Sequence, residues 1–244
     1  MFLTCLALIG TAGAADPAHT LTYALTAGGE HVGTQTVTVR YASGAGGQTS
    51  RTIESTMHLK GLGARGKLAI TERITAHAEG SEPVAFHARI DQGGQVREVQ
   101  GRWTPTSWVV TTLAGGKPAT AELPPDEAHL STADWLDPLS GVGGLALAQE
   151  EEARVLSAER GDVQVGPVRA IEGHDVALGG GGTVSVQGVS WTGPAGLTEL
   201  HYASGGFLVK FRRPMFGAVI EGTLQGRPPG GVDDFPLMPA VGVE

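Results

Sequence analysis

Cysteine is almost absent from this chain, since Cys5 is the only one among 244 residues. A single thiol excludes intramolecular disulfides and zinc sites built from several cysteines. Charged residues are also scarce, at 17%, and this scarcity, most marked for Lys, argues against coiled coils and helical bundles. The hydrophobic fraction of 41% is too high for a disordered chain.

Basic residues are outnumbered by acidic ones. The chain has 17 Lys and Arg against 25 Asp and Glu, which gives a net charge of −8. Binding to nucleic acid depends on basic contacts to phosphates, and docking to an anionic membrane depends on the same sign of charge. We therefore expect no nucleic-acid partner.

Glycine and proline, in contrast, are abundant, with 38 and 14 residues. The glycines have no three-residue period, which excludes collagen. Many of them stand in pairs or short runs between segments that alternate apolar and polar residues, as at Gly28-Gly29 and Gly93-Gly94. This placement indicates the turns of a protein with many strands.

The N-terminal segment resembles an export signal. Phe2–Ile9 is apolar but shorter than the about 20 residues that span a bilayer. Ala12-Gly13-Ala14 then fits the A-x-A rule for signal cleavage, although the usual basic residues before the apolar run are missing. We predict a signal peptide at residues 1–15 and a periplasmic or secreted mature protein without cysteine. No later run approaches membrane length, so we expect no transmembrane segment in the mature chain.

Period-two alternation recurs after this segment and predicts a mostly β protein. In Lys67–Glu79, for example, Leu68, Ile70 and Ile74 share one face while polar residues take the other. One apolar and one polar face are typical of antiparallel strands. The strands expected from such runs are Leu21–Leu25, Val32–Tyr41, Thr52–Lys60, Lys67–Glu79, Val84–Asp91, Val96–Trp103, Thr106–Leu113, Glu152–Ser157, Val163–Ile171, Thr183–Val189, Leu197–Ala203, Phe207–Arg213 and Gly217–Leu224. Short turns between them predict a large antiparallel meander.

One segment near the middle has a different pattern. Ser131 or Thr132 can cap a helix, and Leu136, Leu139 and Val142 are spaced for one helical face. We expect one short central helix within Thr132–Leu147. No composition shift divides the rest, so residues 16–226 are predicted to form a single β-rich domain, followed by an extended Pro-rich tail at 227–244.

The order of these elements resembles a class of exported bacterial β-rich domains of unknown function. The matching segments are the hairpin from Tyr23 to Gly33, the central Trp135-Leu136-Asp137-Pro138 segment, and the hairpin from His201 to Lys210. The resemblance implies a half-barrel or open barrel, in which a curved sheet partly wraps a helix or a hydrophobic groove. It implies no catalytic residues. Its likeness to periplasmic lipoprotein carriers is an analogy of fold.

Glu72 is the most informative polar residue. It falls in the apolar phase of its strand, between Ile70 and Ile74. An unpaired carboxylate is costly to bury, so we expect Glu72 to line a cavity or to have a partner, such as an Arg on a neighbouring strand, unless a strand edge or a bulge exposes it. Aromatic residues are the other candidates for lining a hydrophobic site, with ordinary core packing as the alternative: Trp103, Trp108, Trp135, Phe207 and Phe211.

Three histidines on successive strands offer a weaker alternative. His58, His77 and His87 lie in the polar phase, where imidazoles can bind a metal but also occur as ordinary surface residues. No H-x-H spacing brings two of them together, so we predict no metal site. Gly188–Thr192 starts like a nucleophile elbow but lacks its closing glycine, and Gly179–Gly182 lacks the Lys of a phosphate loop. We therefore predict no catalytic residues and no cofactor.

Three functions remain open. The first is a non-enzymatic binding or carrier protein for a hydrophobic small molecule or an envelope protein, and this is the one the sequence favours. The second is a hydrolase with a polar site around Glu72 and the sheet histidines. The third is a structural interaction protein that uses an exposed sheet edge.

Overall fold

The computed structural model describes residues 18–43, 48–60, 67–79, 82–124, 130–131, 151–204 and 206–226. Within these ranges the chain forms strands and no helix. The strands are β1 (Ala18–Ala27), β2 (Glu30–Ser43), β3 (Gln48–Lys60), β4 (Lys67–Glu79), β5 (Glu82–Gln92), β6 (Gln95–Trp103), β7 (Trp108–Ala114), β8 (Lys117–Leu123), β9 (Leu130–Ser131), β10 (Glu152–Leu156), β11 (Val163–Ala177), β12 (Thr183–Gly193), β13 (Gly196–Ala203), β14 (Leu208–Met215) and β15 (Ala218–Leu224).

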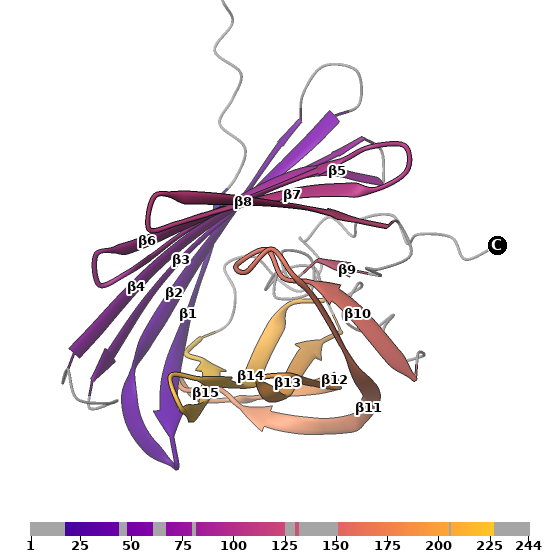
Figure 1. Cartoon of the computed structure of the whole chain (residues 1–244). Coiled ribbons are helices and arrows are strands. Elements are labelled where there is room, and N and C mark those ends of the chain that lie inside the picture. The colour runs from indigo at the N-terminus through magenta and orange to yellow at the C-terminus, as the bar shows by residue number, and fades with distance from the viewer. Residues whose placement is uncertain are drawn as a thin grey trace, which may run out of the picture.

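All fifteen strands belong to one sheet, in the order β8-β7-β6-β5-β4-β3-β2-β1-β15-β14-β13-β12-β11-β10-β9. Each half is a meander, and the halves join where β1 pairs with β15. Every pair is antiparallel except β9 with β10. In the described residues the edge strands β8 and β9 do not pair, so the sheet is not closed. The half from β1 to β8 curves over the half from β9 to β15 (Figure 1).

The predicted mostly-β, antiparallel sheet is therefore confirmed. Each expected strand falls largely within an observed one, and inward residues alternate with outward ones as the pattern required, with Leu21, Tyr23 and Leu25 buried on β1. The predicted helix within Thr132–Leu147, the signal peptide at 1–15 and the tail at 227–244 lie outside the described residues. Among the residues described, no helix has the length and apolar character needed to cross a membrane.

Strand β8 was not predicted. Its sequence, Lys-Pro-Ala-Thr-Ala-Glu-Leu, has no apolar alternation, and the strand is exposed along almost all of its length. It pairs only with β7 in the described residues, and this backbone pairing defines it. Lys117 and Pro118 at its start are residue types that discourage an edge strand from pairing with another chain.

The turn between β10 and β11 packs against the inner face of the opposite half-sheet. Leu156 and Ala158 belong to a buried cluster with Phe86, Val99 and Val110 from β5, β6 and β7. A Cβ atom on Gly161 would lie 2.6 Å from Thr112 Oγ1 and 3.1 Å from side-chain carbons of Val110 and Val99. Only a residue without a side chain fits there, so the turn is seated closely inside the curve of the sheet.

Candidate functional site

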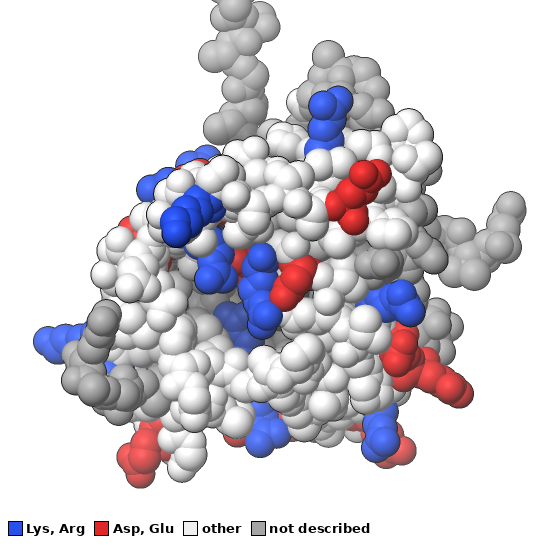
Figure 2. Space-filling model, viewed as in Figure 1, with Lys and Arg blue, Asp and Glu red and all other residues white. Residues whose placement is uncertain are grey.

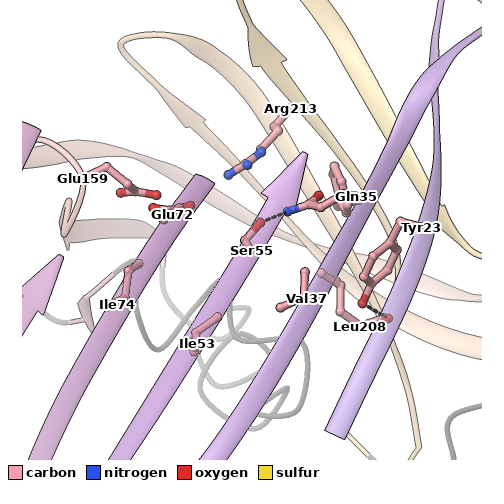
Figure 3. Close-up of a pocket in the computed structure, with 11 residues that line it drawn as sticks. Tyr23, Gln35, Val37, Ile53, Ser55, Glu72, Ile74, Glu159, Leu208 and Arg213 are labelled. Atoms are coloured by element: carbon pink, nitrogen blue, oxygen red, sulfur yellow. Dashed lines mark hydrogen bonds between the residues drawn. The ribbon is translucent and has the colours of Figure 1, made fainter. Parts of the chain in front are cut away.

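A cavity lies inside the curve of the sheet, between the strands of the first half and β14. The space that the centre of a water molecule can reach in it is about 50 Å³, well above the about 10–15 Å³ that a single water needs. Its walls are mostly apolar, and a group of polar residues lies among them (Figure 3). The lining residues are Tyr23, Gln35, Val37, Ile53, Ser55, Glu72, Ile74, Glu159, Leu208, Phe211 and Arg213.

The apolar wall is fixed by contacts between β1 and β14, the two strands on either side of β15. The Tyr23 hydroxyl donates a hydrogen bond of 2.9 Å to the Leu208 carbonyl, and its ring lies 5.6 Å from that of Phe211. Phe211 in turn occupies the space above Gly222, where a Cβ atom would come within 2.2 Å of the ring. The glycine on β15 therefore allows an aromatic side chain from β14 to line the cavity.

A polar stripe crosses the inner face of three adjacent strands. Ser55 on β3 stands opposite Glu72 on β4, and Gln35 on β2 donates a hydrogen bond of 2.8 Å to the Ser55 hydroxyl. Gln35 and Ser55 are each only 7% exposed. Burial of polar side chains costs free energy unless they are hydrogen-bonded, and the bond between Gln35 and Ser55 offsets part of that cost.

A second carboxyl group reaches Glu72 from the β10–β11 turn. Glu159 lies in that turn, and its Oε2 accepts a hydrogen bond of 3.1 Å from the hydroxyl of buried Ser157. The Ser157 carbonyl also accepts a bond of 2.7 Å from the Gly161 amide, which closes the turn. Figure 3 shows the carboxyl groups of Glu159 and Glu72 next to each other, with Arg213 extending from β14 toward the same end of the cavity.

The electrostatics of Glu72 follow from this arrangement. Burial in the interior disfavours the charged carboxylate, the Glu159 carboxylate adds repulsion, and the Arg213 guanidinium opposes both. The result raises the pKa of Glu72 from 4.5 to about 8. Glu72 is therefore mainly a neutral carboxylic acid at pH 7.

Three polar atoms at this end of the cavity are buried without a hydrogen-bond partner among the described residues. They are Gln35 Oε1, Glu72 Oε1 and Arg213 Nε. Buried polar atoms in native proteins are nearly always paired, so each unpaired one requires an explanation. All three come from residues that line this one cavity.

The structure places some predicted site residues in this cavity and others elsewhere. Glu72 and Phe211 line it. Trp103 and Trp108 pack together in the cluster around β5 to β7, with ring centroids 5.5 Å apart, and Phe207 is buried in the main core. Trp135 lies outside the described residues. The Arg whose charge acts on Glu72 is Arg213 on β14, across the interior, rather than one on a neighbouring strand.

The three candidate histidines are exposed on the outer face and are not brought together. His77 on β4 lies diagonal to His87 on β5, but His58 pairs with Ala69, eight positions from His77 along β4. Within the described ranges no three His, Cys, Asp or Glu side chains are placed to hold a metal ion. The Glu72 carboxyl faces the interior, so these histidines do not share a site with it.

Most of the polar residues around Glu72 were not predicted from the sequence, although three of them show the same pattern as Glu72. Gln35 precedes Val37 and Val39 in the inward phase of β2, Ser55 stands between Ile53 and Met57, and Arg213 follows Phe211. A polar residue in the apolar phase of a strand is therefore the sequence pattern shared by the polar residues that line this site from strands. Glu159 lies in a turn, where no periodicity could indicate it.

A pair of histidines lies apart from this cavity on the other half of the sheet. His201 is 7% exposed, and the His174 ring meets it edge to face at 5.0 Å, after an irregularity in the pairing of β11 between Ile171 and His174. Burial, then the His174 and Lys210 charges, lower the pKa of His201 from 6.5 to about 4. His201 is therefore neutral at physiological pH.

On the face shown in Figure 2 most of the described surface is uncharged, and a hollow near its middle has Lys or Arg side chains beside an acidic one.

Together, the open curved sheet and its interior cavity define a β-barrel-like protein. A search of solved structures finds the same fold in the crystal structure of a β-barrel-like protein of the domain of unknown function DUF1849 from Brucella abortus, with a TM-score of 0.58 and 12% identity. The match covers 86% of this chain and 97% of that one, and at this identity it shows the fold alone. No protein-family model and no curated protein matches the chain.

Proposed function

We propose that this protein is a non-enzymatic binding or carrier protein of the cell envelope that holds a hydrophobic small molecule inside its curved sheet. The observation that carries the proposal is the interior cavity, where apolar walls meet three buried polar atoms without partners among the described residues. Binding sites for small molecules are typically apolar with a few placed polar groups. The Val37, Ile53 and Ile74 side chains supply the apolar part, and Gln35 and Glu72 supply polar atoms.

The test is to purify the full chain from the envelope fraction of cells that express it, and to examine it by native mass spectrometry. A bound small molecule should appear as a defined mass increment that is lost on denaturation. Val37→Phe, which fills the cavity, should abolish the increment. Thr38→Phe places the same side chain on the outward-facing neighbour and should retain it. A wild-type protein that never carries a ligand and binds no hydrophobic dye would contradict the proposal.

The envelope location rests on the N-terminal segment. A-x-A at Ala12–Ala14 after a short apolar run supports export and cleavage. Sequencing the N-terminus of the protein recovered from the periplasm or the medium should show a mature chain that begins just after this motif, at Ala15 or Asp16. A full-length chain retained in the cytoplasm would refute this part of the proposal without affecting the cavity.

A hydrolase is the second candidate, and the carboxyl pair favours it. A protonated Glu72 beside Glu159 is an arrangement suited to general acid catalysis, in which one carboxyl group donates a proton and another stays charged. Aryl glycosides and esters with a chromogenic leaving group test this directly. Turnover by the wild type that is lost in Glu72→Gln would establish catalysis, whereas no turnover of any substrate leaves binding as the function.

A further inference from the structure

Three polar side chains at one end of the cavity set the hydrogen-bonding groups that a ligand has to bring. Gln35 Oε1, Glu72 Oε1 and Arg213 Nε are buried and have no hydrogen-bond partner in the part of the chain that the structure describes. In Figure 3 the end of the Arg213 side chain lies between Glu72 and Gln35. The three atoms differ in whether they donate or accept, so together they restrict the chemistry of a group that lies among them.

Gln35 supplies an acceptor. Its side chain is only 7% exposed, and its amide nitrogen donates a hydrogen bond of 2.8 Å to the Ser55 hydroxyl. This bond leaves the amide oxygen, Oε1, as an acceptor in a residue that lines the cavity. A buried acceptor without a donor costs free energy, so a ligand that donates to Gln35 Oε1 gains more than one that does not.

Arg213 and Glu72 supply donors. An arginine side chain has donors and no acceptor, so Arg213 Nε requires an acceptor from the ligand. The guanidinium of Arg213 lies 5.7 Å from the centre of the Phe211 ring, which lines the same cavity. Burial is the main cause that raises the pKa of Glu72 to about 8, so at pH 7 this carboxyl group is mainly protonated and can donate from Oε1. The site therefore offers two donors and one acceptor.

We infer that the ligand of this cavity is a neutral alcohol, whose hydroxyl group lies among these three polar atoms and whose apolar body lies along Val37 and Ile53. A hydroxyl has one donor and two acceptor lone pairs, which complements the two donors and one acceptor of the site. Its hydrogen is donated to Gln35 Oε1, and its oxygen accepts from Arg213 Nε and Glu72 Oε1. This inference rests on the proposed function and adds the chemical class of the ligand.

Other head groups leave part of this set unpaired. An ammonium group has donors alone and cannot accept from Arg213 Nε. A carboxylate, an ether or a ketone has acceptors alone and cannot donate to Gln35 Oε1. A primary amide both donates and accepts, but one of its two N–H groups has no acceptor in this set. Because a hydroxyl is neutral, its fit does not depend on how the charge of nearby Glu159 is balanced.

The experiment compares two isomers of the same composition, 1-butanol and methyl propyl ether. The reachable space of about 50 Å³ is a few times what one water needs, so a four-carbon probe suits it. Both isomers have an oxygen that accepts hydrogen bonds, but only the alcohol donates one. Binding is followed at pH 7 by NMR titration of the full chain labelled at its Ile and Val methyl groups, because Val37, Ile53 and Ile74 line the cavity. We expect butanol to bind at least about fivefold tighter, as for one additional hydrogen bond to a buried acceptor.

Two variants test the roles of the polar atoms. Gln35→Leu removes the acceptor that only the alcohol uses, so it should abolish the preference for butanol over the ether. Arg213→Met removes a donor that both oxygens use, so it should weaken both probes while the preference for butanol remains. Gln100→Leu makes the same change as Gln35→Leu at an exposed position of β6, and as the matched control it should alter neither affinity.

The outcomes separate this inference from the proposed function. Equal binding of the two isomers by the wild type, a comparison that needs no variant, would overturn the alcohol inference and leave the hydrophobic site standing. A preference for butanol that persists in Gln35→Leu would do the same, as would tighter binding of butylamine or butyrate measured alongside. A ligand without a hydroxyl group in the native mass spectrum would also overturn it. If no probe shifts the methyl signals and native mass spectrometry shows no ligand, the proposed function itself fails.

Discussion

Glu72 holds its proton more tightly in the folded protein than in the unfolded chain. Its pKa is about 8 in the fold and near 4.5 without it. Between these values the unfolded chain releases the proton and the folded chain keeps it, so the folded state loses stability as pH rises from about 4.5 to about 8. Above that range both states are ionised, and the destabilisation is complete.

Glu72→Gln removes this dependence because glutamine does not titrate. The variant should gain stability relative to the wild type as pH rises from 5 to 8.5, by an amount on the order of a few kcal/mol at the upper end. Urea unfolding of both proteins at a series of pH values measures it. His201 acts in the opposite sense, since its folded pKa of about 4 makes stability fall as pH drops below 6.5. Because both proteins contain His201, its contribution cancels when the free energy of unfolding of the wild type is subtracted from that of the variant.

A constant difference across this pH range would show that Glu72 is ionised or solvated in the folded protein. Glu54→Gln serves as the control, because the Glu54 carboxylate is paired with Arg40 on the outer face of β3. Its effect on stability should be small, as for most surface ion pairs.

At the scale of the strand, close approach of neighbouring backbones depends on Gly33. A Cβ atom at this position would lie 1.8 Å from the backbone carbonyl oxygen of His58 on β3. A backbone atom cannot move aside as a side chain does. The pairing of β1 with β2 also shifts register between Leu25 and Thr26, next to the Leu25–Gly33 pair. Gly33 therefore marks a place where three strands are drawn together.

Gly33→Ala should lower the free energy of unfolding by about 1–3 kcal/mol or more, because β2 and β3 must separate to accept one methyl group. Thermal unfolding followed by circular dichroism measures the loss. Gly226→Ala is the matched control, since a Cβ atom there meets nothing within 4 Å. Equal melting temperatures for the two variants would mean that the sheet widens at Gly33 without cost.

The alternation of apolar and polar residues predicted the strands that bury one face, in both halves of the sheet. It failed at β8, because an exposed edge strand needs no apolar face and is formed by pairing with β7. Glu72 was recognised because it interrupts an apolar phase, yet Glu159 was not, since its position depends on how the β10–β11 turn packs against β6 and β7. Contacts between distant segments therefore account for what local pattern did not predict.

At the scale of the whole molecule, the pairing of β1 with β15 joins strands from opposite ends of the described chain. Tyr23 pairs with Leu224, and the Gln225 amide donates a hydrogen bond of 2.8 Å to the Thr22 carbonyl. The other connection, from β8 to β9, links the two strands that form the edges of the sheet in the described residues. The local pattern of the sequence contains no sign of this order, which arises because both meanders share one interior.

A circular permutant tests how this strand order affects folding. If residues 226 and 18 are joined by a short Gly/Ser linker and the chain is opened between residues 126 and 127, β15 and β1 become a hairpin. The permutant should keep the wild-type circular dichroism spectrum and should refold faster, because its longest-range strand pairing has become local. Stopped-flow refolding measures the rate. An unchanged rate would show that the pairing of β1 with β15 forms after the slow step of folding.

The same seam has a consequence during protein synthesis. Tyr23 and Leu224 are separated by 201 positions, so at about 5–20 residues per second the ribosome takes roughly 10–40 s to deliver the partner of β1. Until then one side of β1 has a free backbone edge and the apolar face of the first eight strands lacks its opposite wall. A nascent chain of this design has to be shielded from other chains until its last strand emerges.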